Sequence, residues 1–366
     1  MSEMHVTETY PNVTSQHDVC PIPFKIDPYF GCPYQCAYCF AKSTIAFNRN
    51  ISRRKKGLPD LTGLSHLDVE KFRRWVARSY EVPYNYKNPH LVAFKERIPI
   101  KVGGNCDPFP PAESRLGITK QVLEILHERD YPTQILTKNP RLLYEVSKGF
   151  DNPNWAVSVS LISLNEEFLR RVEINTPSAK ERLKYIEALA TQGRPVLVKV
   201  QPAIYPYILN DLDTLVPAIK NSGAWGFNIE GLKTKPTDSF YKEMQLDRHY
   251  IRISGVDTEL KLRCKLEYLR KAKELADTHG LSLFVADNYV PDLPKYSCGA
   301  ECCGTEKLRN YKIFARNEKT LQFGGCTNAS LEFEKCKVNH TYSRFKYKHL
   351  SFEELDDKKT EGSFGL

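Results

Sequence analysis

The sequence lacks any long apolar run. No stretch approaches the ~18 consecutive apolar residues that a membrane span requires, and the first residues lack the basic start and apolar core of a secretory signal. We therefore expect a cytoplasmic protein with no membrane partner. In a reducing compartment, its eleven cysteines are expected to serve as metal ligands or free thiols rather than as disulfides.

The composition is that of an ordinary globular protein. The chain has 366 residues, of which 41% are hydrophobic and 27% charged. This length suits one large α/β domain with appendages, or two domains. There are 53 Lys and Arg residues against 44 Asp and Glu, giving a net charge of +9. The excess mildly favours an anionic partner such as nucleic acid.

The most informative motif comprises three closely spaced cysteines: Cys32, Cys36 and Cys39. Thiolates are the usual protein ligands of iron–sulfur clusters. Three of them leave one iron of a [4Fe-4S] cluster open to another ligand. Two other interpretations remain: zinc with a distant fourth ligand, in a nucleic-acid-binding protein without catalysis, or three unconnected thiols.

Short β-rich runs alternate with helical stretches. The expected strands are Phe24–Asp27, Ile98–Gly103, Thr133–Thr137, Ala156–Leu161, Val196–Gln201 and Trp225–Ile229, followed by a seventh apolar run at Leu281–Ala286. The expected helices are Arg115–Arg129, Ala179–Thr191 with Ser178 as N-cap, and Thr258–Thr278. Six strand–helix units predict a parallel sheet with right-handed crossovers, and so an α/β fold of the partial (β/α)6 barrel type.

The predicted organisation has four parts. Residues 1–19 form a loose arm, 20–287 the partial barrel, 288–350 a Cys-rich extension and 351–366 an acidic tail. The extension is expected to contain a hairpin, with strands in Leu308–Ala315 and Thr320–Phe323.

Several motifs point to a known family. The cysteine spacing resembles that of the radical S-adenosylmethionine (SAM) superfamily. The later motifs resemble its spore photoproduct lyase-like branch, over about Cys32 to Leu232. These motifs are Asn105–Pro108, Leu136–Lys138, Glu173–Ser178, Arg182-Leu183, Gln192-Gly193 and Gln201–Ile204. The resemblance implies a [4Fe-4S] cluster whose open iron binds SAM. One electron would then cleave SAM to a 5′-deoxyadenosyl radical, which abstracts hydrogen from a substrate.

The resemblance also implies which residues bind SAM. In the family, a Gly-rich turn after the second strand binds the amino group. A lysine at a strand end can pair with the carboxylate of SAM, and we expect an aromatic residue beside the adenine. The expected cofactor-binding residues are Tyr38, Gly103, Gly104, Lys138, Ser158 and Ser160. For the lysine, a solvated surface position is the alternative. For the two serines, capping of a sheet edge is the alternative.

One departure from the family bears on the chemistry. The lyase has a hydrogen-donating cysteine shortly before a Ser-Asp pair. Here that cysteine's place falls on Gly104, and Cys106 stands where serine is expected. Alternate residues of an extended segment point the same way, so Cys106 is a candidate donor. We expect Cys106, Asp107 and Tyr34 to handle the radical or place the substrate, although a small buried thiol without a role is the competing interpretation of Cys106.

The C-terminal region has a second cysteine group. Cys298, Cys302, Cys303 and Cys326 are candidates for a second site, holding either an iron–sulfur cluster or zinc, with independent buried thiols as the alternative. Tyr342–His349 interleaves aromatic and basic residues, which suits base stacking and phosphate contact, or else an edge strand guarded by lysines.

The leading functional hypothesis is a radical SAM enzyme acting on a nucleobase, in DNA, RNA or a nucleotide, of the lyase or base-modifying type. Its reaction would be repair, C–C cleavage, rearrangement or modification. A small-molecule or peptide substrate is the second hypothesis. Either enzyme would need an electron donor such as flavodoxin or ferredoxin.

Overall fold

The fold comes from a computed structural model. It describes residues 5–7, 10–13, 22, 24–41, 63–83, 88–235, 238–252, 258–287, 290, 295–298 and 303–312. Cys302, Cys326 and the strip Tyr342–His349 lie outside these residues, as does most of the expected hairpin.

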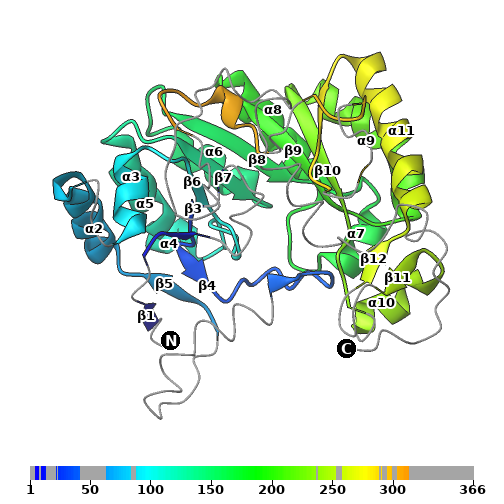
Figure 1. The fold of residues 1–366 in the computed structure, drawn as a ribbon, viewed down its shortest axis with the longest axis horizontal. Helices are drawn as coiled ribbons and strands as arrows, with labels where there is room; N and C mark the ends of the chain where they lie inside the picture. Colours follow the sequence, from blue (N-terminus) through cyan, green and yellow to red (C-terminus); the bar gives the residue numbers. More distant parts are fainter. Residues whose placement is uncertain are drawn as a thin grey trace, which may run out of the picture.

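A single large sheet organises the chain (Figure 1). Its strands follow the order β2, β3, β6, β7, β8, β9, β10, β13, and every neighbouring pair from β3 to β13 is parallel. The bounds are β2 Asn12–Val13, β3 Phe24–Ile26, β6 Ile100–Val102, β7 Thr133–Thr137, β8 Trp155–Ser160, β9 Val196–Ala203, β10 Gly226–Gly231 and β13 Ser282–Val285. This confirms the partial-barrel prediction, and the seventh apolar run, Leu281–Ala286, forms the seventh parallel strand, β13.

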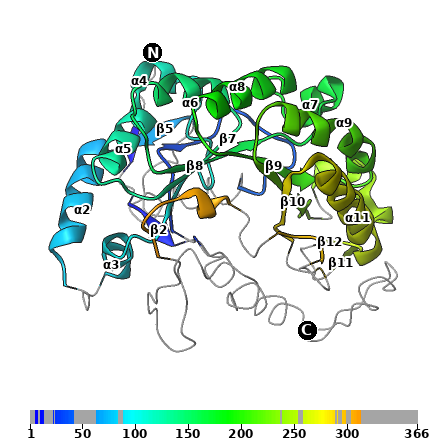
Figure 2. The same ribbon diagram turned by 90° about the horizontal axis from the view of Figure 1, so that it is seen from above.

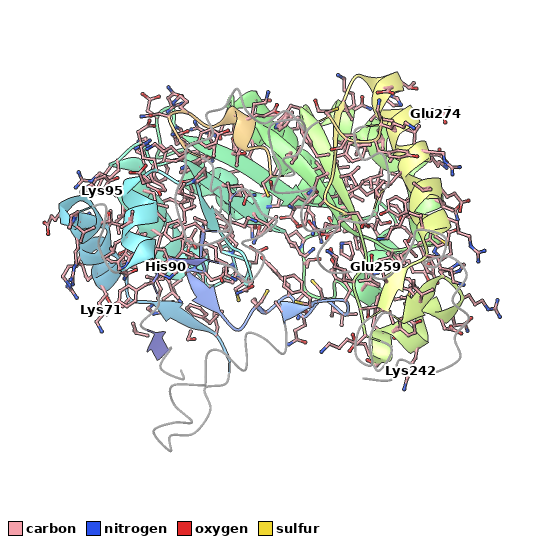
Figure 3. All side chains as sticks on the ribbon, viewed as in Figure 1. Lys71, His90, Lys95, Lys242, Glu259 and Glu274 are labelled. Carbon is pink, nitrogen blue, oxygen red and sulfur yellow. The ribbon has the colours of Figure 1, made fainter. Side chains whose placement is uncertain are left out.

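Helices cover the outside of this curved sheet as an arc (Figure 2). The α-helices of the described residues are α2 Val69–Glu81, α3 Pro89–Lys95, α4 Glu113–Leu116, α5 Ile118–His127, α6 Pro140–Ser147, α7 Glu166–Val172, α8 Ala179–Thr191, α9 Tyr207–Asn221, α10 Ser239–Glu243 and α11 Leu262–His279. Of these, α10 lies beside β11 (Tyr250–Arg252) on the lower side of Figure 1. Because the helices shield the sheet, β8 and β10 are buried along their whole length. Charged side chains such as Lys71 and Glu274 lie on the outer helices (Figure 3).

The segments that follow the strands gather along one edge of the sheet, the lower side of Figure 1. They include β4 (Tyr29–Phe30) and β5 (Ser65–Leu67), which pair with each other, and β11 (Tyr250–Arg252), which pairs with β12 (Thr258–Leu260). The carboxyl ends of parallel strands meet at this edge, where α/β barrels carry their active groups.

Three local predictions need correction. The expected helix Arg115–Arg129 is divided into α4 and α5 at Gly117, whose φ of 60° ends the first helix. The expected helix Thr258–Thr278 begins only at Leu262, because Thr258–Leu260 is drawn into the β11–β12 ladder. The expected loose arm contains β1 (His5–Thr7), which pairs with β5, and the edge strand β2.

One helix is confirmed in detail. Helix α8 has the predicted bounds, and the side chain of Ser178 accepts a hydrogen bond from the backbone N–H of Glu181, as an N-cap should. In the part of the expected hairpin that the structure describes, 308–312, there is no strand. No helix within the described ranges has both the length and the apolar character needed to cross a bilayer.

Candidate active site

The cysteine loop begins directly after β4, at the edge where the strands end. Cys36 is buried, whereas Cys32 and Cys39 are half-buried, and all three are free thiols. The loop therefore presents three unbridged sulfur ligands within eight consecutive residues, at the position where the sequence predicted the cluster.

The three thiols have different environments. The Cys106 thiol contacts that of Cys32, and this hydrogen bond lowers the pKa of Cys32, against the effect of burial. Burial raises the pKa of Cys36 to about 11, although nearby Lys138 opposes the shift. A thiolate therefore forms more readily at Cys32, next to the candidate hydrogen donor Cys106, than at Cys36.

The donor set fits a four-iron cluster. Each thiolate of such a cluster binds a different iron, so the sulfur atoms need not converge on one point. Among the residues that the structure describes, no three His, Cys, Asp or Glu side chains are arranged as ligands of a single metal ion. Three free thiols on one loop match the cluster interpretation without requiring a further protein ligand.

The expected Gly-rich turn packs tightly against its neighbours. Gly103 has φ of 90°, and a Cβ there would lie 2.5 Å from Cδ of Pro108 and 2.7 Å from the carbonyl oxygen of Leu136. At Gly104, a Cβ would lie 2.8 Å from Cδ of Lys25. The missing side chains let the turn approach β7, so packing alone accounts for glycine at Gly103.

A buried aspartate holds the next part of this turn. Oδ1 of Asp27 accepts hydrogen bonds from the backbone N–H groups of Asn105 (2.8 Å) and Cys106 (3.2 Å). Burial raises the pKa of Asp27, while these backbone donors oppose the rise. Asp27 thereby fixes the backbone that carries the candidate donor Cys106 beside Cys32.

Asp107 joins the turn to the end of β7. Its Oδ1 accepts a hydrogen bond from Oγ1 of Thr137 (2.7 Å), and its Oδ2 accepts one from the backbone N–H of Lys138 (2.6 Å). The hydroxyl of Tyr34 donates to the carbonyl of Phe109 at 2.8 Å. The catalytic candidates Tyr34, Cys106 and Asp107 thus lie close together, and their roles remain predictions.

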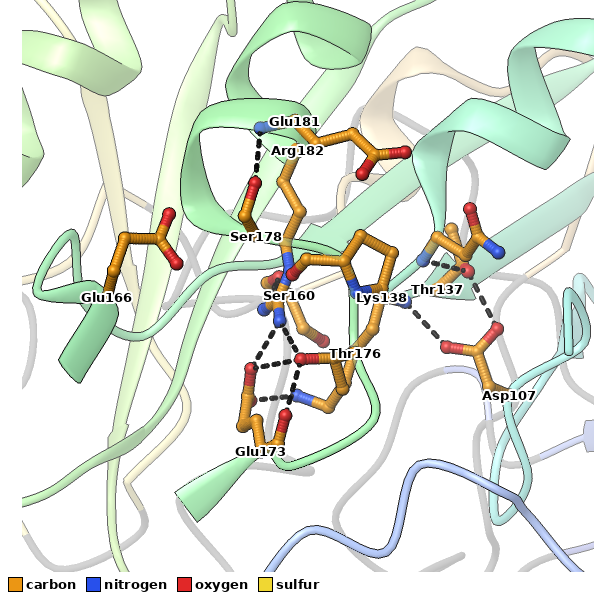
Figure 4. A network of polar contacts seen from close by, with 12 residues as sticks. Asp107, Thr137, Lys138, Ser160, Glu166, Glu173, Thr176, Ser178, Glu181 and Arg182 are labelled. Carbon is orange, nitrogen blue, oxygen red and sulfur yellow. Dashed lines mark hydrogen bonds and ion pairs between the residues drawn. The ribbon is translucent and has the colours of Figure 1, made fainter. Parts of the chain in front are cut away.

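Lys138 and Arg182 meet at a third side chain, Glu173 (Figure 4), which Tyr38 also contacts. Nζ of Lys138 lies 2.6 Å from Oε1 of Glu173 and 2.9 Å from the hydroxyl of Tyr38, and that hydroxyl also donates to Glu173. On the other side, a guanidinium nitrogen of Arg182 lies 2.6 Å from Oε2 of Glu173. Lys138 is therefore partly buried and paired, which argues against the solvated surface alternative.

Glu173 is ionised in this setting. Burial would raise the pKa of its carboxyl, but Lys138 and Arg182 outweigh burial and lower the pKa to about 2. The same carboxylate raises the pKa of Lys138, although burial acts in the opposite direction. Both partners therefore keep their charges at neutral pH.

The two expected serines have separate surroundings. Oγ of Ser158 accepts a hydrogen bond from the side-chain amide of Gln134 at 3.0 Å inside the sheet. The backbone carbonyl of Ser160, at the end of β8, accepts one from Arg182 at 3.1 Å. Ser160 thus reaches the Glu173 group through its backbone, and contact of either serine with SAM stays a prediction.

The second cysteine group is only partly described. Cys298 is exposed and Cys303 is buried, while Cys302 and Cys326 lie outside the described residues. A second metal site therefore remains a prediction.

Sequence reasoning assigned no role to Glu173, Arg182 or Asp27. Glu173 and Arg182 belong to the motifs that carry the family resemblance, and their place in these motifs could have marked them as candidate site residues. Nothing in the sequence around Asp27 marks it, because its partners lie 78 and 79 residues further along the chain.

No family model matches the chain. An uncharacterized protein of Mycobacterium bovis is 27% identical over 221 residues, which cover 58% of this chain and 59% of that protein. The match therefore spans about three fifths of the mycobacterial relative. An uncharacterized protein of Methanocaldococcus jannaschii is 21% identical over 233 residues, covering 63% of this chain and 80% of that protein.

Among solved structures, a mutant of spore photoproduct lyase matches with a TM-score of 0.53 at 12% identity, covering 72% of this chain and 76% of that one. The same lyase complexed with a dinucleoside spore photoproduct matches with a TM-score of 0.51 at 12% identity and the same coverage. The chain has the fold of spore photoproduct lyase, so the resemblance to the radical SAM superfamily drawn from its motifs is confirmed at the level of the fold.

Proposed function

We propose that this chain is a radical SAM enzyme that acts on a nucleobase, in DNA, RNA or a nucleotide. The observation that carries the proposal is the position of the three free thiols. They lie at the carboxyl edge of a partial barrel whose fold is that of spore photoproduct lyase. Active groups of such barrels belong at this edge.

In this proposal Cys32, Cys36 and Cys39 hold a [4Fe-4S] cluster, which supplies the electron for homolytic cleavage of SAM. The chain positions the reactants and excludes water. The strand-end residues Lys138 and Ser160 would orient SAM.

Cys106 is proposed to return a hydrogen atom to the product. Its thiol is buried, lies against Cys32 and is held by backbone bonds to Asp27. Since hydrogen transfer needs short contacts, this enclosed position suits a donor close to the cluster loop.

The nucleobase assignment rests on two supports. Spore photoproduct lyase, whose fold the chain shares, has been solved with a dinucleoside spore photoproduct. The net charge of +9 favours a phosphate-bearing partner. The reductant would be a small electron carrier such as flavodoxin or ferredoxin.

The test is anaerobic reconstitution followed by reduction with dithionite in the presence of SAM. We expect about four irons per chain and release of 5′-deoxyadenosine. Cys36→Ser should abolish both, whereas Cys264→Ser, at a buried thiol on α11, should leave both unchanged. A colourless protein that binds zinc and releases no 5′-deoxyadenosine would refute the proposal.

The substrate class is tested separately by filter binding. We expect duplex or single-stranded DNA or RNA to be retained at low salt and released as salt increases, because phosphate contacts are weakened by counterions. If no nucleic acid binds, and only a mixture of small molecules or peptides stimulates 5′-deoxyadenosine formation, the nucleobase assignment is wrong while the radical SAM assignment stands.

A further inference from the structure

A short segment at the end of α7 holds the cysteine loop. The backbone N–H of Ala37 donates to the carbonyl of Val172 at 2.8 Å. The side-chain amide of Asn175 donates to the carbonyl of Pro33 at 3.0 Å. From the same segment, Glu173 accepts a hydrogen bond from the hydroxyl of Tyr38. Three contacts therefore join the cysteine loop to Val172–Asn175, at the end of α7.

Of these three contacts, the one made by Glu173 is the only one that involves a charged side chain. Glu173 is 2% exposed. Its carboxylate is bound on one side by Lys138 and on the other by Arg182, which is fully buried. Arg182 in turn donates to the carbonyls of Ser160 (3.1 Å) and Pro177 (2.9 Å), which fixes it to β8 and to the turn before α8. The carboxylate is thus anchored to the barrel before it meets the loop.

Tyr38 lies between two of the expected ligands, Cys36 and Cys39. A bond to its hydroxyl therefore limits the movement of both neighbouring cysteines. Hydrogen bonds that hold metal ligands from behind commonly change metal affinity by about 10–100-fold when they are removed.

We propose that Glu173 is a positioning residue for the cysteine loop, acting through the hydroxyl of Tyr38 and anchored to the barrel by Lys138 and Arg182. This inference rests on the proposed function, since the loop must bind a cluster for the positioning to matter. It also gives Lys138 a role in holding the loop besides the expected contact with SAM.

The test compares the rate at which reconstituted protein loses iron to a chelator. Glu173→Gln keeps the side-chain shape but weakens the bonds to Tyr38 and Lys138, so iron loss should be about tenfold faster than in the wild type. The EPR signal of the reduced cluster should also broaden. The matched control is Glu259→Gln, at a carboxylate that is also buried and lysine-paired but lies on β12, away from the loop. It should lower stability without changing iron loss.

Tyr38→Phe provides a second variant that leaves the three charged groups in place. It should accelerate iron loss as Glu173→Gln does, and the double variant should lose iron no faster than Tyr38→Phe alone, because both changes remove one contact. The inference would be overturned if the two changes multiplied their effects on the rate of iron loss in the double variant. It would also be overturned if Tyr38→Phe lost iron no faster than the wild type. If the wild type itself bound no iron, the proposed function would fall as well.

Discussion

At the scale of single residues, Gly103 shows how closely the Gly-rich turn packs against β7. Replacement by Ala would place a Cβ against the backbone of Leu136 and the ring of Pro108, at a φ of 90° that L-residues rarely adopt. We predict that Gly103→Ala lowers the free energy of unfolding by about 3 kcal/mol or more, measured by urea denaturation.

Gly149 is the control for this change. Its φ is not positive, and a Cβ there would meet only the carbonyl oxygen of Val146, at 3.6 Å. Gly149→Ala should therefore change the free energy of unfolding by less than about 1 kcal/mol. Equal effects at the two glycines would contradict the packing argument.

The sequence was sufficient to find residues within a motif, but not those that act across the fold. Cys32, Cys36 and Cys39 are recognisable because their spacing is local. Glu173 has its loop contact 135 residues away, at Tyr38, and no local pattern encodes such a pair. Only the parallel arrangement of β7 and β8 brings Lys138 and Glu173 to the same edge.

At the scale of elements, a buried ion group joins α11 to the sheet. Nζ of Lys265 lies 2.8 Å from Oδ1 of Asp287, just after β13, and also contacts Glu259 on β12; all three residues are buried. We predict that Lys265→Met lowers the free energy of unfolding by about 3–5 kcal/mol, because both buried carboxylates lose this cation. Chemical denaturation would measure the loss.

The partner variants serve as the check. Adding Glu259→Gln and Asp287→Asn to Lys265→Met removes the stranded charges, so part of the lost stability should return. The triple variant could instead be less stable than Lys265→Met by the sum of the effects of Glu259→Gln and Asp287→Asn measured alone. That result would show that Lys265 is not coupled to the two carboxylates in the way the distances indicate.

The elements themselves were largely predictable, since apolar runs and helical spacing are local signals. Helix α8 was predicted with its cap, whereas the division at Gly117 was missed because glycine is tolerated within many helices. The strand Thr258–Leu260 was missed because it exists only through pairing with β11.

At the scale of the whole molecule, Glu173 should make stability depend on pH. Its pKa in the folded protein is about 2, below the ordinary value of 4.5, because Lys138 and Arg182 outweigh burial. Its contribution is therefore complete above pH 4.5 and is lost as the pH falls toward about 2. We predict that Glu173→Gln, which cannot titrate, loses less stability than the wild type across this range.

Denaturant unfolding at a series of pH values would measure the difference, with Glu145→Gln, at an exposed carboxylate, as the control. Parallel pH profiles for wild type and Glu173→Gln would show that the carboxylate is not held ionised by its neighbours.

The architecture of the whole molecule could be predicted from alternating strands and helices, and it brings segments that are distant in the sequence to one edge of the sheet. The central claim is that this edge holds a cluster with one iron open to SAM. EPR spectroscopy of the reduced, anaerobically reconstituted protein, with and without SAM, tests it most directly. We predict a [4Fe-4S]+ signal that changes when SAM is added and is absent in Cys36→Ser. A cluster signal that SAM leaves unchanged, or none in the wild type, would contradict the account.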